Sequence, residues 1–179
     1  IYFIDNDDYF SRKAVLTDEA GVHFGDNDER AIFFARGVLE TVKKLRWTPS
    51  VVHCHGWFSS VVPIYLKHTF ADDPIFRDVK IVVSLYDDAY PGTLDPGFAA
   101  KVANEGVETK NLSVLAEPSY ENLLRFVLQY ADGVVAASPG IAPEVLETVR
   151  QSGVKLLEYQ SPADADFFDN YNRFYEEIQ

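Results

Sequence analysis

The sequence predicts an α/β domain built on a doubly wound, mostly parallel β-sheet. Short apolar runs rich in valine alternate along the chain with segments in which apolar residues recur at helical spacing. Such runs are typical of strands that are covered on both faces, and strands separated by helices are joined by right-handed crossovers. With 179 residues and 47% hydrophobic content, the chain is large enough to bury one such core.

The expected elements follow in chain order. Strands are expected at residues 1–4 ("IYFI"), 51–54 ("VVHC"), 80–86 ("KIVVSLY"), 133–137 ("GVVAA") and 155–159, where β-branched and other apolar residues cluster. Helices are expected at residues 28–45, 57–68, 120–130 and 143–151, where apolar residues recur every three or four positions. Residues 87–118 are irregular and rich in glycine and proline, and they predict a long loop with one helix at 98–104.

The pattern changes after Gln160. Ser161 and Pro162 are typical of a helix start, and an aromatic face follows at helical spacing, made of Phe167, Phe168, Tyr171, Phe174, Tyr175 and Ile178. We expect residues 161–179 to form a helix that packs on the domain of residues 1–160. The alternative is a lid or a homo-oligomer contact.

Charge and composition exclude some classes of function. The formal charge of −12 argues against nucleic acid, whose binding depends on Lys and Arg neutralising phosphates. Acidity of this size suits a neutral ligand such as a carbohydrate. The sequence contains neither an apolar stretch that predicts a membrane span nor a secretory signal, and its one cysteine, Cys54, agrees with a reducing compartment. We therefore expect a cytoplasmic protein.

Polar residues follow several of the expected strands, at the edge where parallel sheets bind ligands. His53, His55, Gly56 and Trp57 end one strand, Asp87 and Asp88 end another, and Ser138 ends a third. His53 and His55 project to the same face of their strand, whereas Cys54 points to the opposite face and is expected to be a buried hydrophobe. These loops are therefore expected to share one rim. Asp26 and Asn27 precede the helix at 28–45, whose amides they can cap.

Several chemistries remain open for this rim. His53 and His55 form an H-x-H pair, which is half of several metal-hydrolase sites, and Asp87 and Asp88 are the only obvious further ligands nearby. His53 could instead be a hydrogen-bonded tether at the end of its strand. Gly56 would let a ligand approach the backbone at a helix start, which suits a phosphate. Trp57 could line the site or belong to the core.

Two segments identify a family resemblance. The segment "DNDERAIFFARGVLETVKKLRWTPSVVHCHGWFSSVVPIYLK" resembles the N-terminal catalytic domain of glycogen and starch synthases, which carries D-N-x-x-R-F and W-x-P-D-V-V-H-x-H-D-W. The segment "YADGVVAASPGIAPEV" resembles the Y-A-D-x-I-T-A-V-S-P-x-Y-A-x-E-I of the same family. The resemblance covers roughly residues 26–145.

The resemblance implies one half of a GT-B architecture, in which two Rossmann-like domains face a cleft. The activity it implies is transfer of glucose from ADP-glucose to the non-reducing end of an α-1,4-glucan, with retention of configuration and without a metal or cofactor. His55 matches the family histidine that lines the sugar site. Asp26 and Asn27 match the acceptor-side pair, and His53, Gly56, Trp57, Asp87, Asp88 and Ser138 are expected to contact substrate.

The chain also departs from the family pattern. Gly56 replaces the Asp of H-D-W, and Asp87 and Asp88 stand where the family has His and Asn. We expect the family's K-x-G-G-L loop and first strand to precede Ile1, and we find no counterpart of its nucleotide-binding second domain. Two hypotheses follow: an acceptor-side half of a glucosyltransferase that needs a donor domain in cis or from a partner chain, or a non-catalytic glucan-binding or regulatory module. The segment alone is expected to be inactive.

Overall fold

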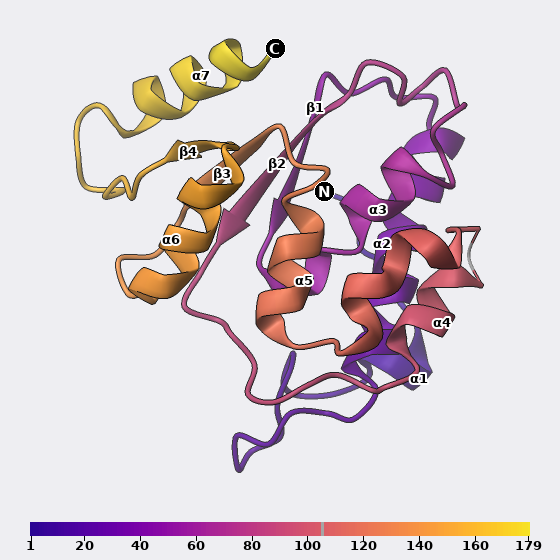
Figure 1. The fold of residues 1–179 in the computed structure, drawn as a ribbon. Coiled ribbons are helices and arrows are strands. Elements are labelled where there is room, and N and C mark those ends of the chain that lie inside the picture. Colours follow the sequence, from indigo (N-terminus) through magenta and orange to yellow (C-terminus); the bar gives the residue numbers. More distant parts are fainter. Residues whose placement is uncertain (105) are drawn as a thin grey trace.

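The computed structural model describes residues 1–104 and 106–179. Its centre is a parallel sheet whose strands follow one another in chain order, β1 (Val51–His55), β2 (Lys80–Leu85), β3 (Gly133–Ala136) and β4 (Lys155–Leu157) (Figure 1). The register pairs His53 with Val82 and His55 with Ser84, and then Val83 with Val134. The parallel α/β class predicted from the alternation of strands and helices is confirmed.

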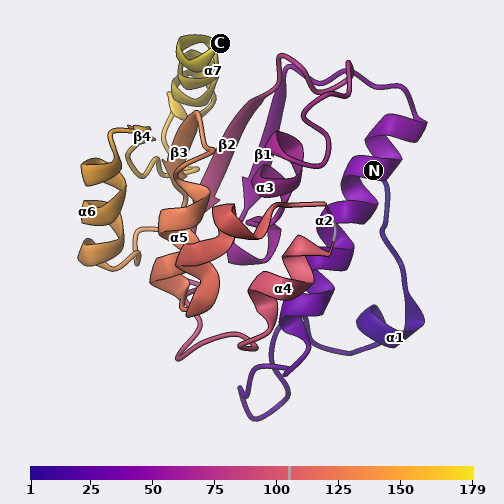
Figure 2. The same ribbon diagram turned by 45° about the vertical axis from the view of Figure 1, so that its right-hand side comes forward.

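Helices connect the strands and flank them. The chain contains α1 (Asp7–Phe10), α2 (Asn27–Lys44), η1 (Trp57–Ser59), α3 (Val62–Lys67), α4 (Phe98–Ala103), η2 (Thr109–Ala116), α5 (Tyr120–Val127), α6 (Pro143–Ser152) and α7 (Phe167–Ile178). Figure 2 shows α4 beside α2, although more than fifty residues separate them in the chain. Because the described strands follow chain order without reversal, right-handed crossovers bring the connecting helices to one face of the sheet.

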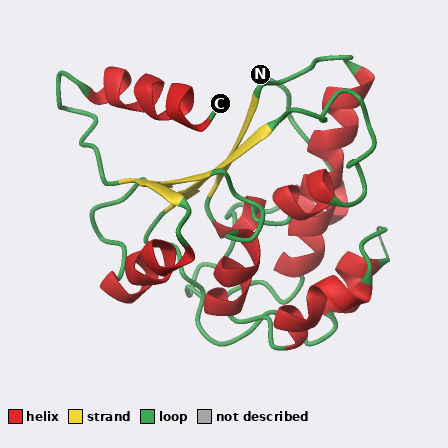
Figure 3. Ribbon diagram, turned by 45° about the horizontal axis from the view of Figure 1, so that its top comes forward, coloured by secondary structure: helices red, strands yellow, loops and turns green. Residues whose placement is uncertain are grey.

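The two faces of the sheet carry separate cores. Cys54, Ile81, Val83 and Val134 belong to the larger core, which lies beneath α2, α3 and α5. Val82 and Val135 point to the other face, where they pack against Phe174 and Ile178 of α7. Figure 3 shows α7, the helix that ends at the C-terminus, across the sheet from most of the other helices. Helices therefore cover both faces, and one of the two faces depends on α7.

Close packing at one glycine explains how α7 lies so near the sheet. A Cβ atom added to Gly133 of β3 would come within 2.7 Å of Phe174 Cζ. Phe174 is buried, whereas Phe168 is 75% exposed and does not contribute to the expected aromatic face. The C-terminal helix thus uses two turns of that face, at Phe174 and Ile178, for its buried contact with the sheet.

Four expectations about elements were wrong, and one is the single helix expected within residues 87–118, where η2 follows α4. Residues 1–4 do not form a strand: Ile1 and Phe3 are exposed, and Ile4 lies against Gly37 of α2. A short apolar run fits a strand by composition, but it becomes one only when a neighbouring strand pairs with its backbone. The C-terminal helix begins at Phe167 rather than near Ser161, after a series of turns.

The helix expected at 57–68 is divided into η1 and α3. Pro63 lies in the first turn of α3, where a backbone N–H would have no partner within the helix. In a continuous helix, Pro63 could not donate the backbone hydrogen bond to the carbonyl of Ser59. The chain therefore makes one 3₁₀ turn and restarts. The short helix α1 was not predicted from the sequence.

Candidate functional site

The predicted site residues fall into two groups at the carboxyl ends of the strands and the start of α2. His53, His55, Gly56 and Trp57 lie at the end of β1, and Asp87 and Asp88 follow β2. Asp26 and Asn27 lie at the start of α2. Among the described residues, no hydrogen bond, ion pair or ring contact joins either histidine to Asp26 or Asn27. Trp57 of the first group packs against Tyr90, which lines the same cavity as Asn27.

The histidines form a stacked pair on the face of the sheet covered by α7. Their ring centroids lie 4.2 Å apart at an interplanar angle of 27°. Both nitrogens of His53 are engaged, with Nδ1 2.7 Å from the hydroxyl of Tyr175 and Nε2 2.7 Å from that of Ser84. His55 Nδ1 lies 2.9 Å from the hydroxyl of Tyr86. His53 is therefore a tethered, half-buried ring, and His55 presents Nε2 at the exposed end of the strand.

Burial keeps this pair neutral. Burial, followed by the proximity of His55, lowers the pKa of His53 to about 4. Burial also lowers the pKa of His55. A neutral imidazole carries one donor and one acceptor nitrogen, and its partner hydroxyl decides which is which. His55 can therefore hydrogen-bond a neutral hydroxyl compound at Nε2 without carrying charge into the site.

Gly56 and Asp88 occupy adjoining space after the two strands. Gly56 has φ 70° and ψ 170°, a backbone conformation essentially confined to glycine. Asp88 Oδ2 accepts a hydrogen bond from the backbone N–H of Trp57 at 3.2 Å, and it would lie only 2.6 Å from a Cβ on Gly56. Burial raises the pKa of Asp88, and the nearby Asp87 raises it further. Asp88 thus occupies the space into which a side chain at position 56 would extend.

Trp57 belongs to the core. It is 3% exposed and packs edge-on against Tyr90, with ring centroids 4.8 Å apart. Ser138 and Asp87 lie at the ends of β3 and β2, where Asp87 Oδ2 would be 3.0 Å from a Cβ on Gly140. The hydroxyl of Ser138 accepts a hydrogen bond from the Gly140 N–H at 3.2 Å. These two residues are part of one rim with Asp88.

At the start of α2, neither Asp26 nor Asn27 caps the helix with its side chain as expected. Asp26 forms a two-pronged ion pair with Arg12, at 2.7 and 2.5 Å, and that hydrogen bonding lowers the pKa of Asp26. Asn27 is 2% exposed: its Nδ2 donates to the Leu16 carbonyl at 2.8 Å, and its Oδ1 accepts from Arg30 at 2.5 Å. Both residues therefore organise the loop that precedes α2.

The next residue, Asp28, was not predicted as a site residue and has the stronger structural signal. Asp28 is 1% exposed, and its Oδ2 accepts a hydrogen bond from Lys101 of α4 at 2.7 Å. Its Oδ1 is buried and has no hydrogen-bond partner. Such an atom is costly unless a ligand or water donates to it. The "DNDER" segment offered several acidic residues, and only the packing shows which one is left with a free oxygen.

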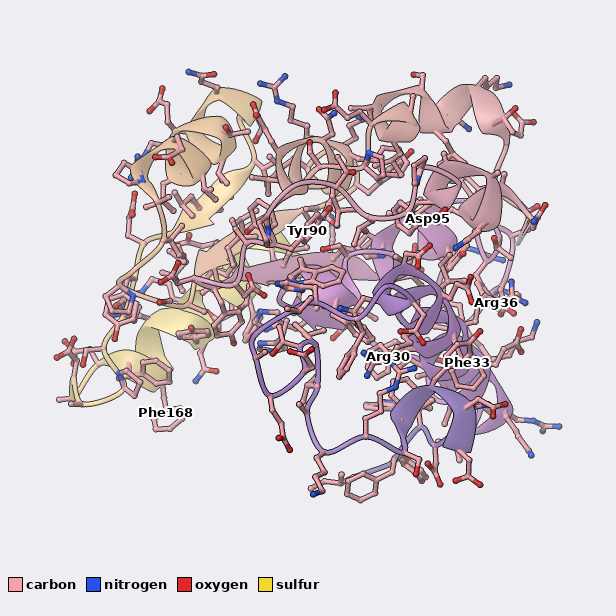
Figure 4. The ribbon with its side chains drawn as sticks, turned by 90° about the horizontal axis from the view of Figure 1, so that it is seen from below. Arg30, Phe33, Arg36, Tyr90, Asp95 and Phe168 are labelled. Atoms are coloured by element: carbon pink, nitrogen blue, oxygen red, sulfur yellow. The ribbon has the colours of Figure 1, made fainter. Side chains whose placement is uncertain are left out.

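Asp28 lines a cavity of about 140 Å³ between the start of α2 and the loop after β2. The other residues that line it are His23, Phe24, Gly25, Asn27, Tyr90, Pro91, Thr93, Leu94 and Asp95. Figure 4 looks at this side of the molecule and labels Tyr90 and Asp95 on the loop and Arg30 on α2. A concave site that combines apolar residues with a few polar groups is typical of small-ligand binding, and here the charged lining groups are the carboxylates of Asp28 and Asp95.

The metal-hydrolase interpretation finds no support in the geometry. Within residues 1–104 and 106–179, no three His, Cys, Asp or Glu side chains are grouped so that they could hold one ion. Cys54 is 4% exposed on the opposite face of β1, and burial raises the pKa of its thiol to about 12. It is the buried hydrophobe that the alternation of β1 predicts. In the same part of the chain, no helix has the length and apolarity that crossing a bilayer requires.

The parallel sheet with its flanking helices defines a Rossmann-like α/β domain, and comparison with known proteins names the family. The starch synthase catalytic domain family matches residues 1–158. The chain therefore belongs to that family, which confirms the resemblance seen in the sequence.

Relatives with curated names agree. The chain is 30% identical to a glycogen synthase of Pelodictyon phaeoclathratiforme over 164 residues, which cover 89% of this chain and 33% of that protein. It is 33% identical to a glycogen synthase of Chlorobium limicola over 149 residues, which cover 81% and 29%. The chain thus spans about a third of the length of these relatives.

A solved structure shows the same fold. It is the catalytic domain of starch synthase IV from Arabidopsis thaliana bound to ADP and acarbose, which superposes with a TM-score of 0.59. The match has 16% sequence identity and covers 79% of this chain and 31% of that chain.

Proposed function

We propose that this chain is the acceptor-side half of a glucosyltransferase that moves glucose from ADP-glucose to the non-reducing end of an α-1,4-glucan, without a metal or cofactor. The observation that supports it is the family match over residues 1–158, together with glycogen synthases among its relatives. A nucleotide-binding domain, in the same polypeptide or on a partner chain, would complete the site. A cytoplasmic location stays a prediction.

In this proposal the chain's own residues orient the sugar. His55 offers Nε2 to a sugar hydroxyl, and the pair Tyr86 and His53 holds its ring in place. The contribution is orientation and electrostatic support of a positively charged sugar in the transition state, rather than nucleophilic attack. The contacts of Asp87, Asp88 and Ser138 with substrate are part of the same proposal.

The cavity lined by Asp28 allows a specific test of glucan binding to this chain. We infer that a glucan hydroxyl donates a hydrogen bond to the free Oδ1 of Asp28, since a neutral polyol supplies donors without adding a charge. Gly25 lines the cavity, and a Cβ at this position would meet nothing within 4 Å, so a larger side chain has room there. Gly25→Phe should therefore block the cavity, and Gly25→Ala should leave it open.

The experiment is calorimetric titration of the full chain with maltotetraose. We expect the wild type and Gly25→Ala to bind alike, and Gly25→Phe and Asp28→Asn to bind at least about tenfold more weakly, as loss of a hydrogen bond to a charged group predicts. Glu29→Gln is the control for Asp28→Asn, because Glu29 also pairs with Lys101, at 2.8 Å, but does not line this cavity. A wild type that does not bind maltotetraose would contradict the acceptor-side proposal.

A second candidate is a glucan-binding or regulatory module without catalysis. The observation that favours it is the presence of Gly56 and Asp88, at positions where the resemblance to the family motifs implies Asp and Asn. This module would bind maltotetraose as above, but His55→Ala would leave glucosyl transfer unchanged in an assembled enzyme. Loss of transfer in His55→Ala would instead support the transferase.

A further inference from the structure

The histidine pair receives one of its hydrogen bonds from a segment outside the family match. Tyr175 lies on α7, beyond the residues 1–158 that the family matches, and its hydroxyl is 2.7 Å from Nδ1 of His53. Its ring also meets the His53 ring edge-on, with centroids 5.8 Å apart at 76°. The contact joins residues 122 positions apart in the chain.

Tyr175 is held by packing rather than by its hydrogen bond alone. Phe174, its neighbour, is buried against Gly133, and Ile178 lies one turn further in the same core. Tyr175 itself packs at the border of that core. The hydroxyl therefore arrives at His53 from a helix whose position the sheet determines, so it can fix the plane of the ring.

The plane of His53 matters because His55 lies flat on it. His53 cannot rotate without breaking its bonds to both Tyr175 and Ser84. A fixed His53 ring, 4.2 Å away and 27° from parallel, limits the orientations open to His55. The Tyr86 hydroxyl then holds Nδ1 of His55 at 2.9 Å, so that Nε2 is the nitrogen left for a ligand.

We propose that Tyr175 is a positioning residue: through His53 and the ring stack, α7 sets the orientation of His55, whose tautomer the hydroxyl of Tyr86 sets. A phenol is a better hydrogen-bond donor than acceptor, so Tyr175 donates to His53 Nδ1, and Nε2–H of His53 donates to Ser84. By the same reasoning Tyr86 donates to Nδ1 of His55, and Nε2 carries the proton. His55 thereby becomes a donor toward a sugar oxygen. The effect on substrate binding rests on the proposed function of His55. The coupling between Tyr175 and the two histidines is independent of that function.

The test is nuclear magnetic resonance of the imidazole nitrogens in the full chain, labelled with ¹⁵N. We expect the wild type to show one tautomer for each ring. Tyr175→Phe keeps the ring and removes the hydroxyl, and it should give averaged nitrogen shifts for His53 and altered ones for His55. The midpoint of His53 titration should also rise by at least about one pH unit, since loss of a donor to the neutral ring favours the charged form.

Tyr171→Phe is the matched control. Tyr171 lies on the same helix and packs at the same core, but no hydrogen bond joins it to either histidine. If Tyr175→Phe leaves the His55 signals unchanged, or if Tyr171→Phe changes them as much, the proposal is overturned.

A maltotetraose titration of the same variants separates this result from the proposed function. Altered His55 signals in a chain that binds no glucan would support the coupling and contradict the acceptor-side proposal. If the chain binds glucan and Tyr175→Phe leaves the His55 signals unaltered, the acceptor-side proposal is supported and the coupling is contradicted.

Discussion

Gly56 and Asp88 share one small space at the rim of the sheet: a Cβ on Gly56 would lie 2.6 Å from Asp88 Oδ2. The carboxylate fills the position that a side chain at residue 56 would need, and it holds the backbone N–H of Trp57. Gly56 and Asp88 therefore depend on each other: the space that the carboxylate fills is open only because residue 56 has no side chain. An aspartate placed at position 56 alone would clash with Asp88.

Gly56→Ala should destabilise the domain for two reasons. The backbone at φ 70° and ψ 170° is strained for any residue with a Cβ, at a cost of about 1–3 kcal/mol, and the methyl group meets the carboxylate. Urea unfolding would measure the loss, with Gly25→Ala as the control, because a Cβ at Gly25 meets nothing.

Gly56→Ala loses stability through the contact with Asp88 and through backbone strain. Adding Asp88→Ala should recover the stability lost to the contact but not the stability lost to the strain. Equal losses in the two backgrounds would show that the carboxylate does not contribute, and the double-mutant cycle gives its size.

Phe174→Ala should release α7 from the sheet. Phe174 is 3% exposed, and removing a buried aromatic ring costs about 3–5 kcal/mol. Phe168→Ala, on the same helix but 75% exposed, should change stability by less than about 0.5 kcal/mol. Unfolding curves and limited proteolysis of the turns before Phe167 would measure both. Similar stability losses in the two variants would contradict the packing described for α7.

Asn27→Ala should cost more than Asp26→Asn. Removing the Asn27 amide leaves the buried Arg30 guanidinium and the Leu16 carbonyl each short of a partner, which costs about 1–3 kcal/mol. Asp26 and Arg12 form an ion pair with roughly a quarter to a third of each side chain exposed, so its loss should cost at most about 1 kcal/mol. Urea unfolding ranks the two, and the reverse order would contradict the structural role given to Asn27.

Stability should fall as the pH drops from about 6.5 toward 4, in part because of His53. Its pKa in the folded chain is about 4, lowered by burial and by His55, against an ordinary value of 6.5. In that pH window the unfolded chain binds the proton and the folded chain does not, so acid favours unfolding. Above about 6.5, His53 is neutral in both states and contributes no pH dependence.

Melting temperatures at pH 7 and pH 4.5 would test this, with His53→Gln as the variant that cannot titrate. Besides His55, the groups that face His53 are the hydroxyls of Ser84 and Tyr175, neither of which ionises in this range. His53→Gln should lose less stability between the two pH values than the wild type. An identical loss would mean that His53 is not the group that titrates.

Local patterns predicted the strands well and short segments poorly. The Val-rich strands and the helices at 28–45 and 143–151 were found to within about two residues at each end, because burial on a sheet or a helix face repeats along the chain. Residues 1–4 have the composition of a strand, yet they pair with nothing, since pairing requires a partner that local sequence does not contain. The helix expected at 57–68 contains Pro63, which lacks a backbone N–H. The structure divides the helix there, with Pro63 in the first turn of α3.

The candidate site shows the same division. Alternation along β1 by itself determined that His53 and His55 share a face and that Cys54 is buried behind them, because side chains in a strand alternate whatever surrounds it. Only the tertiary structure decided that a tyrosine 122 residues away forms a hydrogen bond with His53, that Asp88 fills the space at Gly56, and that Asp28, which lines a cavity, keeps one oxygen without a partner. These relationships join residues distant in the chain, and they exist only once the helices and loops have packed around the sheet.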